Sequence, residues 1–166
     1  MQLETFNQLD SGEAQRILQG CVHIPTWISE LLQQRPYSSK EQLYQTALAQ
    51  AQTWQWPEIS AALSQHPRIG EKKAAAVLSE KEQQFSQQEQ GQIQIDAVLQ
   101  LALYQGNLDY EHKFGHIYLI RAAGRSGQQI LSELQRRLKN TAEQERAEVK
   151  QQLGEIALLR LNQEIQ

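Results

Sequence analysis

The sequence contains a single cysteine, Cys21, so neither an intramolecular disulfide nor a metal site built on several cysteines can form within this chain. A free thiol is typical of a protein in a reducing compartment. We interpret Cys21 as a small buried hydrophobic residue, because free cysteines are among the most buried residue types. Without other catalytic residues around it, this cysteine is a weak candidate for a nucleophile.

Long apolar runs are also missing. No stretch approaches the roughly 18 to 20 apolar residues that span a bilayer, so we expect no membrane partner. Residues 1–15 are polar from the second residue onwards and lack the basic and then apolar order of a secretory signal. The final residues, Glu164, Ile165 and Gln166, do not form a peroxisomal signal. We therefore expect a cytoplasmic protein.

Dense basic clusters are absent as well. The chain has 16 Lys and Arg against 19 Asp and Glu, which gives a net charge of −3. This balance argues against nucleic acid or an anionic membrane as the main partner. The sequence has no GxSxG nucleophile elbow, no P-loop and no dinucleotide-binding glycine pattern. These absences disfavour covalent and cofactor-dependent chemistry and leave a small polar substrate open.

The sequence does contain a series of helix-start signals. Each signal places an acid three residues after a capping side chain: Asp10 with Glu13, Ser38 with Glu41, Ser86 with Glu89, and Asn140 with Glu143. A chain of 166 residues without internal repeats or a flexible linker is long enough to bury one core. We predict an all-α fold, a compact single-domain bundle of about eight helices over residues 1–166.

Apolar periodicity assigns core-facing residues to the first predicted helices. After Ser38, the inward stripe consists of Leu43, Ala47, Ala51 and Trp54. A helix that begins at Pro57 must end near His66, because Pro67 disfavours helical backbone in the residue before it. A further helix is predicted over residues 72–85.

The next predicted helix starts at Ser86 and runs towards Gly106, which is a typical C-terminal breaker. Its apolar stripe consists of Ile93, Val98, Leu101 and Tyr104. A short helix over residues 108–114 is expected to stop at Gly115. Residues 116–124 are apolar and rich in β-branched and aromatic side chains, and we favour a short extended or irregular segment there.

The last two helices are predicted to start at Ser126 and at about Thr141. Their inward residues follow a helical period and are Ile130, Leu131, Leu134, Leu138, Leu153, Ile156, Leu159 and Leu161.

Residues 66–70, HPRIG, place a histidine at a helix exit, followed by a rigid proline corner, a cation and a glycine. A histidine at such a position can simply interact with the helix dipole, and the motif by itself favours that interpretation. The corner also fixes the imidazole on constrained backbone, which suits a proton donor that titrates near neutral pH. His66 is therefore a candidate general acid.

Residues 86–90, SQQEQ, allow two interpretations. Ser86 and Glu89 have the spacing of a capping box, and this structural role explains them by itself. A helix N-terminus also binds anions, so the Ser86 hydroxyl and the first free amides could hold a substrate carboxylate or carbonyl. Both roles use the same groups, and the local pattern leaves both open.

His112 and His116 have the i, i+4 spacing of a metal-binding pair. Gly115 is expected to break the helix between them, and no third ligand is nearby in the sequence. We predict no metal site. A zinc-dependent hydrolase that uses these two histidines is a minor alternative.

Five segments, taken together and in order, resemble the 2-oxo-4-hydroxy-4-carboxy-5-ureidoimidazoline (OHCU) decarboxylase family. They are HPRIG (66–70), SQQEQ (86–90), GNLDYEHKFG (106–115), YLIRAAGRS (118–126) and the terminal ILSELQRRLKN…EIALLRL. The resemblance covers nearly the whole chain. It implies an all-helical, usually dimeric and cofactor-independent carboxy-lyase, which converts OHCU to S-allantoin and carbon dioxide in urate breakdown.

The resemblance also implies roles for individual residues. His66 is the expected catalytic acid, and Glu89 is expected to face it across the active site. The expected substrate-binding residues are Pro67, Ser86, Gln87, Gln88, Glu89, Gln90, Tyr118, Leu119, Ile120, Arg121 and Ala122. This chain departs from the family in two places. His116, Ile117 and Tyr118 replace an apolar run after Phe114 and Gly115, and Arg121 stands where a small residue or cysteine is common.

Two expectations about partners can be compared. An enzyme of this family would bind a small ureidoimidazoline and form a homodimer. The alternative is a non-catalytic helical interaction module, in which His66 only ends a helix and Ser86 with Glu89 only caps one. That module predicts a shallow surface at these residues.

Overall fold

The computed structural model describes residues 1–70, 80–90 and 96–166. Within these ranges it contains helices and no strands, so the predicted all-α fold is confirmed. The helices are α1 (Leu3–Gln8), α2 (Ser11–Cys21), α3 (Pro25–Gln33), α4 (Lys40–Ala51), α5 (Trp56–Leu63), α6 (Glu80–Gln90), α7 (Ala97–Phe114), α8 (Gly127–Arg137) and α9 (Ala142–Glu164). None of these helices is both long and apolar enough to cross a membrane.

Contacts between residues divide the chain into two units. The first unit comprises Met1–Ala62 and Leu153–Gln166, and the second comprises Leu63–Gln152. Every candidate site residue named above lies in the second unit.

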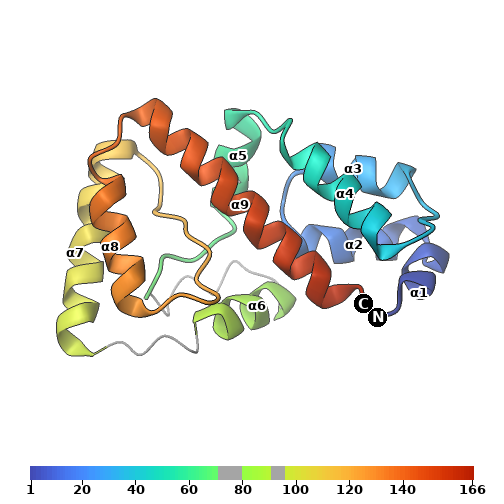
Figure 1. Cartoon of the computed structure of the whole chain (residues 1–166), viewed down its shortest axis with the longest axis horizontal. Coiled ribbons are helices and arrows are strands. Elements are labelled where there is room, and N and C mark those ends of the chain that lie inside the picture. Colours follow the sequence, from blue (N-terminus) through green and yellow to red (C-terminus); the bar gives the residue numbers. More distant parts are fainter. Residues whose placement is uncertain (71–79, 91–95) are drawn as a thin grey trace. The chain divides into compact units, whose positions relative to one another are not determined.

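The first unit confirms the stripe predicted for α4. Its four residues, Leu43, Ala47, Ala51 and Trp54, are all buried, as is Cys21 at the end of α2. The two ends of the chain lie next to each other (Figure 1), where the Gln166 amide donates to the Met1 carbonyl over 2.8 Å.

In the second unit, α7 and α8 pack side by side (Figure 1). The Asp96 side chain caps α7 by accepting a hydrogen bond from the Leu99 amide. Gly115 ends α7 with a φ of 78°, a left-handed conformation that glycine adopts without steric cost. Ser126 and Gln129 form a reciprocal capping box at the start of α8, which confirms the predicted start of this helix.

The structure corrects the prediction that Gly106 ends a helix. Gly106 lies in the middle of α7 and is buried. A Cβ atom at this position would lie 2.5 Å from Leu134 Cδ2 of α8. The glycine therefore permits a close approach of two helices, a tertiary reason that outweighs its cost within a helix.

The predicted inward stripe before Gly106 is also wrong. Val98, Leu101 and Tyr104 are exposed on α7, while Leu103 and Tyr110 are buried. Ile93 lies outside the described residues. Periodicity identifies an apolar face, but α7 has two such faces and uses the other one for its core.

Three of the predicted capping residues also change. Ser39, not Ser38, caps α4. The start of α9 after Thr141 is confirmed, but the capping side chain is that of Thr141, not Asn140, and accepts from the Gln144 amide over 3.2 Å. Ser86 lies inside α6, because the preceding residues 80–84 are good helix formers and continue the helix. The capping box at Ser86 is therefore wrong, as is the helix N-terminus that would bind an anion there, while the role of Ser86 as a substrate-binding residue stays a prediction. Part of the helix predicted over 72–85, residues 72–79, lies outside the described ranges.

Candidate active site

His66 lies in the turn that follows α5, as the sequence predicted. Its amide donates to the Leu63 carbonyl at the end of α5 over 3.1 Å. His66 and Pro67 are both half-buried. The imidazole thus lies at the boundary between solvent and protein, where a side chain can both meet a ligand and exchange protons with water.

The rest of this turn is anchored to α7. Arg68 forms a fork with Glu111, with its Nε 3.0 Å from both carboxylate oxygens and its Nη2 2.8 Å from Oε1. The buried Asn107 donates its Nδ2 to the Ile69 carbonyl over 3.1 Å. Gly70 follows with a φ of 81°. Two contacts with one rigid helix therefore fix the backbone immediately after His66. We call residues 66–70 the site turn.

Residues 118–122, which we call the site segment, lie between Gly115 and the start of α8 and have no regular secondary structure. The predicted irregular segment is thereby confirmed. Four of its side chains are buried, namely those of Tyr118, Leu119, Ile120 and Ala122. Because buried backbone groups need hydrogen-bond partners, such a segment depends on side chains from its neighbours.

Side chains of two helices supply these partners. Arg137 of α8 donates its Nη1 to the Leu119 carbonyl over 2.8 Å. Gln152 of α9 accepts from the Arg121 amide over 2.9 Å. The Tyr118 hydroxyl donates to the Ile130 carbonyl over 3.0 Å. The site segment is consequently held in one conformation although it belongs to no helix or sheet.

The site turn and the site segment meet in one hydrophobic cluster. Ile69 packs in the same cluster as Tyr118, Ile120 and Ala122, together with residues of α7 and α8. The structure therefore brings two of the three predicted site regions together, although they are about 50 residues apart in the sequence.

The third region belongs to α6. Glu82 and Phe85 are buried, and the half-buried Glu89 follows them at helical spacing on the same face. Gln87 and Gln88 are exposed. The side chains of Ser86 and Gln90 lie outside what the structure describes. The facing of His66 and Glu89 stays a prediction.

A buried ion pair lies beneath the site segment. Arg137 and Glu145 are 1% and 0% exposed, and Arg137 Nε donates to Glu145 Oε1 over 2.7 Å. The Tyr110 hydroxyl donates to the same oxygen over 2.5 Å. We call Tyr110, Arg137 and Glu145 the Arg137 network. Sequence reasoning missed it, because Arg136 and Arg137 are neighbours on a mostly polar helix and only packing decides which one is buried.

The network has electrostatic consequences. Burial and then the hydrogen bond to Glu145 raise the pKa of Tyr110 well above its ordinary value. Burial also raises the pKa of Tyr118. For Arg137, burial lowers the pKa, but the hydrogen bond and the charge of Glu145 outweigh it and leave the pKa raised. Both tyrosines therefore stay protonated and the arginine stays charged.

The two histidines of the metal alternative lie at the end of α7 and just beyond it. His112 is exposed, and His116 has its Nδ1 3.0 Å from the Ile117 carbonyl and its ring stacked on Phe114. In the part of the chain that the structure describes, no three His, Cys, Asp or Glu side chains are grouped as metal ligands.

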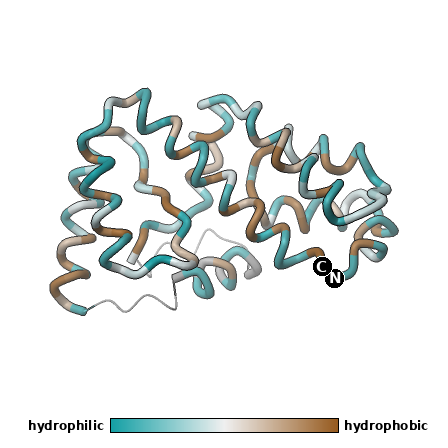
Figure 2. The backbone as a smooth tube through the Cα atoms, viewed as in Figure 1, coloured by the Kyte–Doolittle hydropathy of each residue, from teal (hydrophilic) through white to brown (hydrophobic). Residues whose placement is uncertain are grey.

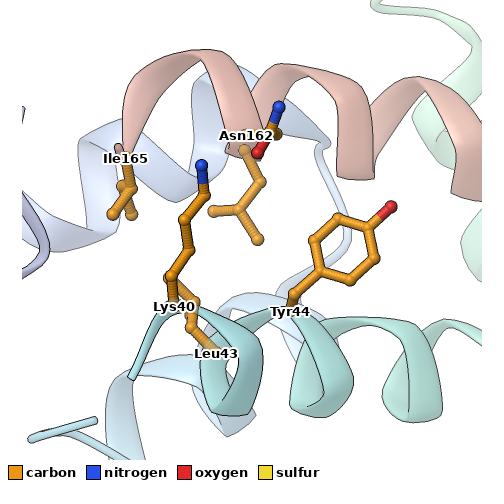
Figure 3. A pocket seen from close by; sticks show the side chains of 6 residues that line it. Lys40, Leu43, Tyr44, Asn162 and Ile165 are labelled. Atoms are coloured by element: carbon orange, nitrogen blue, oxygen red, sulfur yellow. The ribbon is translucent and has the colours of Figure 1, made fainter. Parts of the chain in front are cut away.

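Two pockets lie away from the predicted site residues. One, of about 10 Å³, lies between α4 and the end of α9 and is lined by Lys40, Leu43, Tyr44, Leu161, Asn162 and Ile165 (Figure 3). It has room for about one water molecule. The other, of about 520 Å³, is lined by Asp96, Val98, Leu99, Ala102, Ser126, Gly127, Gln128 and Leu131. Neither pocket contains a predicted site residue.

The fold and the site together define a class of protein. It is an all-helical chain in which a histidine lies on the site turn, beside a buried site segment whose backbone is held by side chains. Comparison with known proteins identifies its family. The model of the family described as OHCU decarboxylase matches residues 7–162, and the chain belongs to this family.

Individual proteins that resemble this chain are consistent with the family assignment. The chain is 26% identical over 164 residues to the uric acid degradation bifunctional protein of Bacillus sp. (strain TB-90). The aligned residues make up 98% of this chain. The chain spans 32% of the length of that relative. The fold resembles a crystal structure of OHCU decarboxylase in the presence of (S)-allantoin (TM-score 0.70, 23% identity, 86% of this chain, 92% of that chain). It also resembles (S)-allantoin synthase (TM-score 0.73, 16% identity, 99% and 54%).

Proposed function

We propose that this protein is a carboxy-lyase that converts OHCU to S-allantoin and carbon dioxide in urate breakdown, without a cofactor. The family match over residues 7–162 is the observation that supports this function most strongly. The names of its relatives, uric acid degradation protein and (S)-allantoin synthase, are consistent with it.

The chemistry of the substrate explains why the chain's own side chains can catalyse this decarboxylation without a cofactor. The substrate carries a carboxylate and a hydroxyl on one ring carbon and a ureido group on the next. When the bond to the carboxylate breaks, carbon dioxide leaves and the electron pair passes into the unsaturated ring. The hydroxyl then loses its proton and becomes the ring carbonyl, while the ureido-bearing carbon takes up a proton and becomes the stereocentre. The protein needs only to orient the ring and deliver this proton from one face.

His66, as imidazolium, is the proposed proton donor. It lies on the site turn, whose backbone is fixed by Asn107 and by the ion pair between Arg68 and Glu111. A donor on fixed backbone delivers its proton to one face of a bound ring, which accounts for formation of the S enantiomer. Pro67 and the backbone of the site segment are the proposed walls of the substrate site.

Glu89 is proposed to accept hydrogen bonds from ring or ureido N–H groups and so to fix which face of the ring meets His66. Its position on the inward face of α6, in line with Glu82 and Phe85, supports this role. Glu89→Gln keeps the shape of the side chain and removes the charge, whereas Glu89→Ala removes both. Equal loss of activity in the two variants would assign the role to charge, and activity retained only in Glu89→Gln would assign it to packing.

The function can be tested with the unstable substrate generated in situ. Urate is oxidised and hydrolysed by the two upstream activities, and the chirality of the allantoin formed is followed by circular dichroism with and without this protein. Faster appearance of S-allantoin is the expected result. An unchanged rate and a racemic product would contradict the proposed function and favour the non-catalytic interaction module.

We also propose that the chain forms a homodimer through α7. Val98, Leu101, Tyr104 and Leu108 form an exposed apolar stripe, with between 45% and 79% of each residue exposed; Figure 2 shows the apolar residues at the start of α7. Contiguous apolar patches exposed on the surface of a protein are often functional. Packing of two copies through this stripe would remove its side chains from water.

Charge favours a second copy as the occupant of this surface. Asp96 caps the start of α7, while His112 and Lys113 lie in its last turn. Antiparallel packing of two α7 helices about a two-fold axis would place the acidic end of each beside the basic end of the other. Leu101→Asp is expected to produce a monomer in sedimentation experiments, and Tyr44→Asp, at an exposed tyrosine of α4, serves as the control. A monomeric wild-type chain would contradict the dimer.

We propose that residues 1–166 act as one domain, which predicts a single unfolding transition. The single buried thiol of Cys21 is consistent with the cytoplasmic location that we propose.

A further inference from the structure

The site segment is buried and irregular, so its shape must be imposed from outside. Its backbone between Tyr118 and Ala122 has neither the internal hydrogen bonds of a helix nor a neighbouring strand in the described part of the chain. The Leu119 carbonyl, in the middle of the segment, accepts its hydrogen bond from the Arg137 guanidinium. The direction of the backbone around Leu119 therefore depends on where that guanidinium is held.

The position of Arg137 is determined by several groups at once. Its Nε and Nη2 lie 2.7 and 2.5 Å from Glu145 Oε1, and its guanidinium carbon lies 4.8 Å from the centre of the Tyr118 ring. Glu145 is itself held by the Tyr110 hydroxyl and by Asn140 Nδ2, which donates to Oε2 over 3.0 Å. A planar guanidinium can serve the carboxylate and the carbonyl simultaneously, whereas the single ammonium of a lysine cannot reproduce this fork.

The neighbouring arginine has no such role. Arg136 is 51% exposed and pairs with Glu133 and Glu148 over 2.8 and 2.5 Å. Its ion pairs with Glu133 and Glu148 do not involve the site segment. Two arginines that are adjacent in the sequence thus both pair with glutamates, one at the surface and one in the interior. Of the two, only Arg137 contacts the backbone of the site segment in the described structure.

We propose that Arg137, oriented by Glu145 and Tyr110, is a positioning residue that sets the backbone of residues 118–122 in the geometry required for decarboxylation. This inference rests on the proposed function, because it takes the site segment as a wall of the substrate site. Arg137 does not touch the substrate. It acts through the Leu119 carbonyl, and through the stack of its guanidinium on Tyr118.

The test compares Arg137→Lys with the matched control Arg136→Lys. Both changes keep the charge and remove the fork, so the buried position keeps a partner for Glu145. In Arg137→Lys we expect kcat for S-allantoin formation to fall roughly 10- to 100-fold, since small displacements of positioning groups have effects of this size. KM should change less, because the other walls of the site remain. Arg136→Lys should stay within about twofold of the wild-type protein.

Hydrogen exchange provides a readout that does not depend on activity. The amides of Leu119–Ala122 should exchange faster in Arg137→Lys than in the wild-type chain, while those of Ile130 and Leu131 in α8 should not change. A merely structural role would accelerate exchange throughout the second unit. If Arg137→Lys does not fold, the double variant Arg137→Gln with Glu145→Gln removes both charges together and can be measured in the same way.

Three outcomes would overturn the proposal. Unchanged exchange in the site segment would show that Arg137 does not hold it. Faster exchange with a wild-type kcat would show that the held geometry is not needed for catalysis. Equal losses in the Arg137 and Arg136 variants would show that the effect does not depend on the contact between Arg137 and the Leu119 carbonyl. A wild-type protein without activity on OHCU would instead contradict the proposed function, while the exchange data would still report whether Arg137 holds the segment.

Discussion

The site turn and the site segment are both irregular, and each is fixed by an arginine paired with a glutamate, but the two pairs lie in opposite environments. Arg68 and Glu111 are 45% and 23% exposed, and their ion pair lies at the surface. Arg137 and Glu145 are almost fully buried. The surface pair is screened by water and salt, so the turn must owe its shape to other contacts as well. The buried pair is screened much less, and removal of one partner leaves an uncompensated buried charge.

The difference in burial of the two ion pairs separates the two site regions by their access to water. His66 lies on the side that water reaches, where a proton donor must be recharged between turnovers. The site segment lies on the side held by buried charge. Variants that remove one contact at a time test this contrast between the surface pair and the buried pair.

The largest expected effect on stability follows from Arg137→Met. Methionine is similar in length but removes the charge, so Glu145 is left buried without its partner. Breaking a buried pair in this way typically costs about 3 to 5 kcal/mol of unfolding free energy. Urea unfolding measures this change, and Arg136→Met at the exposed position should cost at most about 1 kcal/mol. Equal costs for the two variants would contradict the contrast.

High pH should also destabilise the protein, through its buried tyrosines. Burial raises the pKa of Tyr37 to about 12, and the pKa values of Tyr110 and Tyr118 are raised as well. Unfolded tyrosines ionise near pH 10. Their contribution to stability is therefore complete below about pH 10 and is lost as the pH rises from there through the folded-state values. Each tyrosine contributes about 1.4 kcal/mol per pH unit in that window.

Tyr118→Phe provides the control for this effect, because it removes one of the titrating groups. Unfolding measured at about pH 9 and pH 11 should differ less in the variant than in the wild-type chain. An identical difference would show that Tyr118 ionises as readily in the folded protein as in the unfolded one.

A smaller effect is expected from Asn107→Leu, which removes the buried donor to the Ile69 carbonyl. An unsatisfied buried carbonyl costs about 1 to 3 kcal/mol. Asn107 Oδ1 has no hydrogen-bond partner in the described structure, and its removal offsets part of that cost. We expect a net loss of about 1 kcal/mol in urea unfolding, together with lower activity because the site turn loses one anchor. A fully active variant would show that this anchor is dispensable.

The smallest effect is expected from Arg68→Gln. Exposed ion pairs contribute about 0.2 to 1 kcal/mol, and salt screens them. The unfolding free energy of the variant should approach that of the wild-type chain as salt is added. A loss above about 2 kcal/mol would mean that the surface pair stabilises the turn as strongly as a buried one.

Much of the fold could be predicted from local patterns. Asp10 and Ser126 cap α2 and α8 as expected, and Pro67 correctly placed His66 in a turn after a helix. These features are determined within a few residues of the chain, because capping and proline sterics act locally.

The sequence predictions that the structure corrects share a different cause. Ser86 and Glu89 have capping-box spacing but lie inside α6, since the residues before them also favour a helix. Gly106 continues α7 because Leu134 of another helix packs against it. The burial of Arg137, rather than Arg136, depends on its contact with Glu145 eight residues away. In each case, a tertiary contact or a longer helix overrides a short pattern.

The role of His66 is the central claim, and one measurement tests it most directly. Allantoin formed from substrate generated in situ is followed by circular dichroism for the wild-type protein, His66→Asn and the control His112→Asn, in which an exposed histidine of α7 is replaced. With all three proteins folded, we expect His66→Asn to form S-allantoin about 10²- to 10⁴-fold more slowly, and His112→Asn to match the wild-type rate. If His66→Asn still forms S-allantoin at nearly the wild-type rate, His66 is not the proton donor.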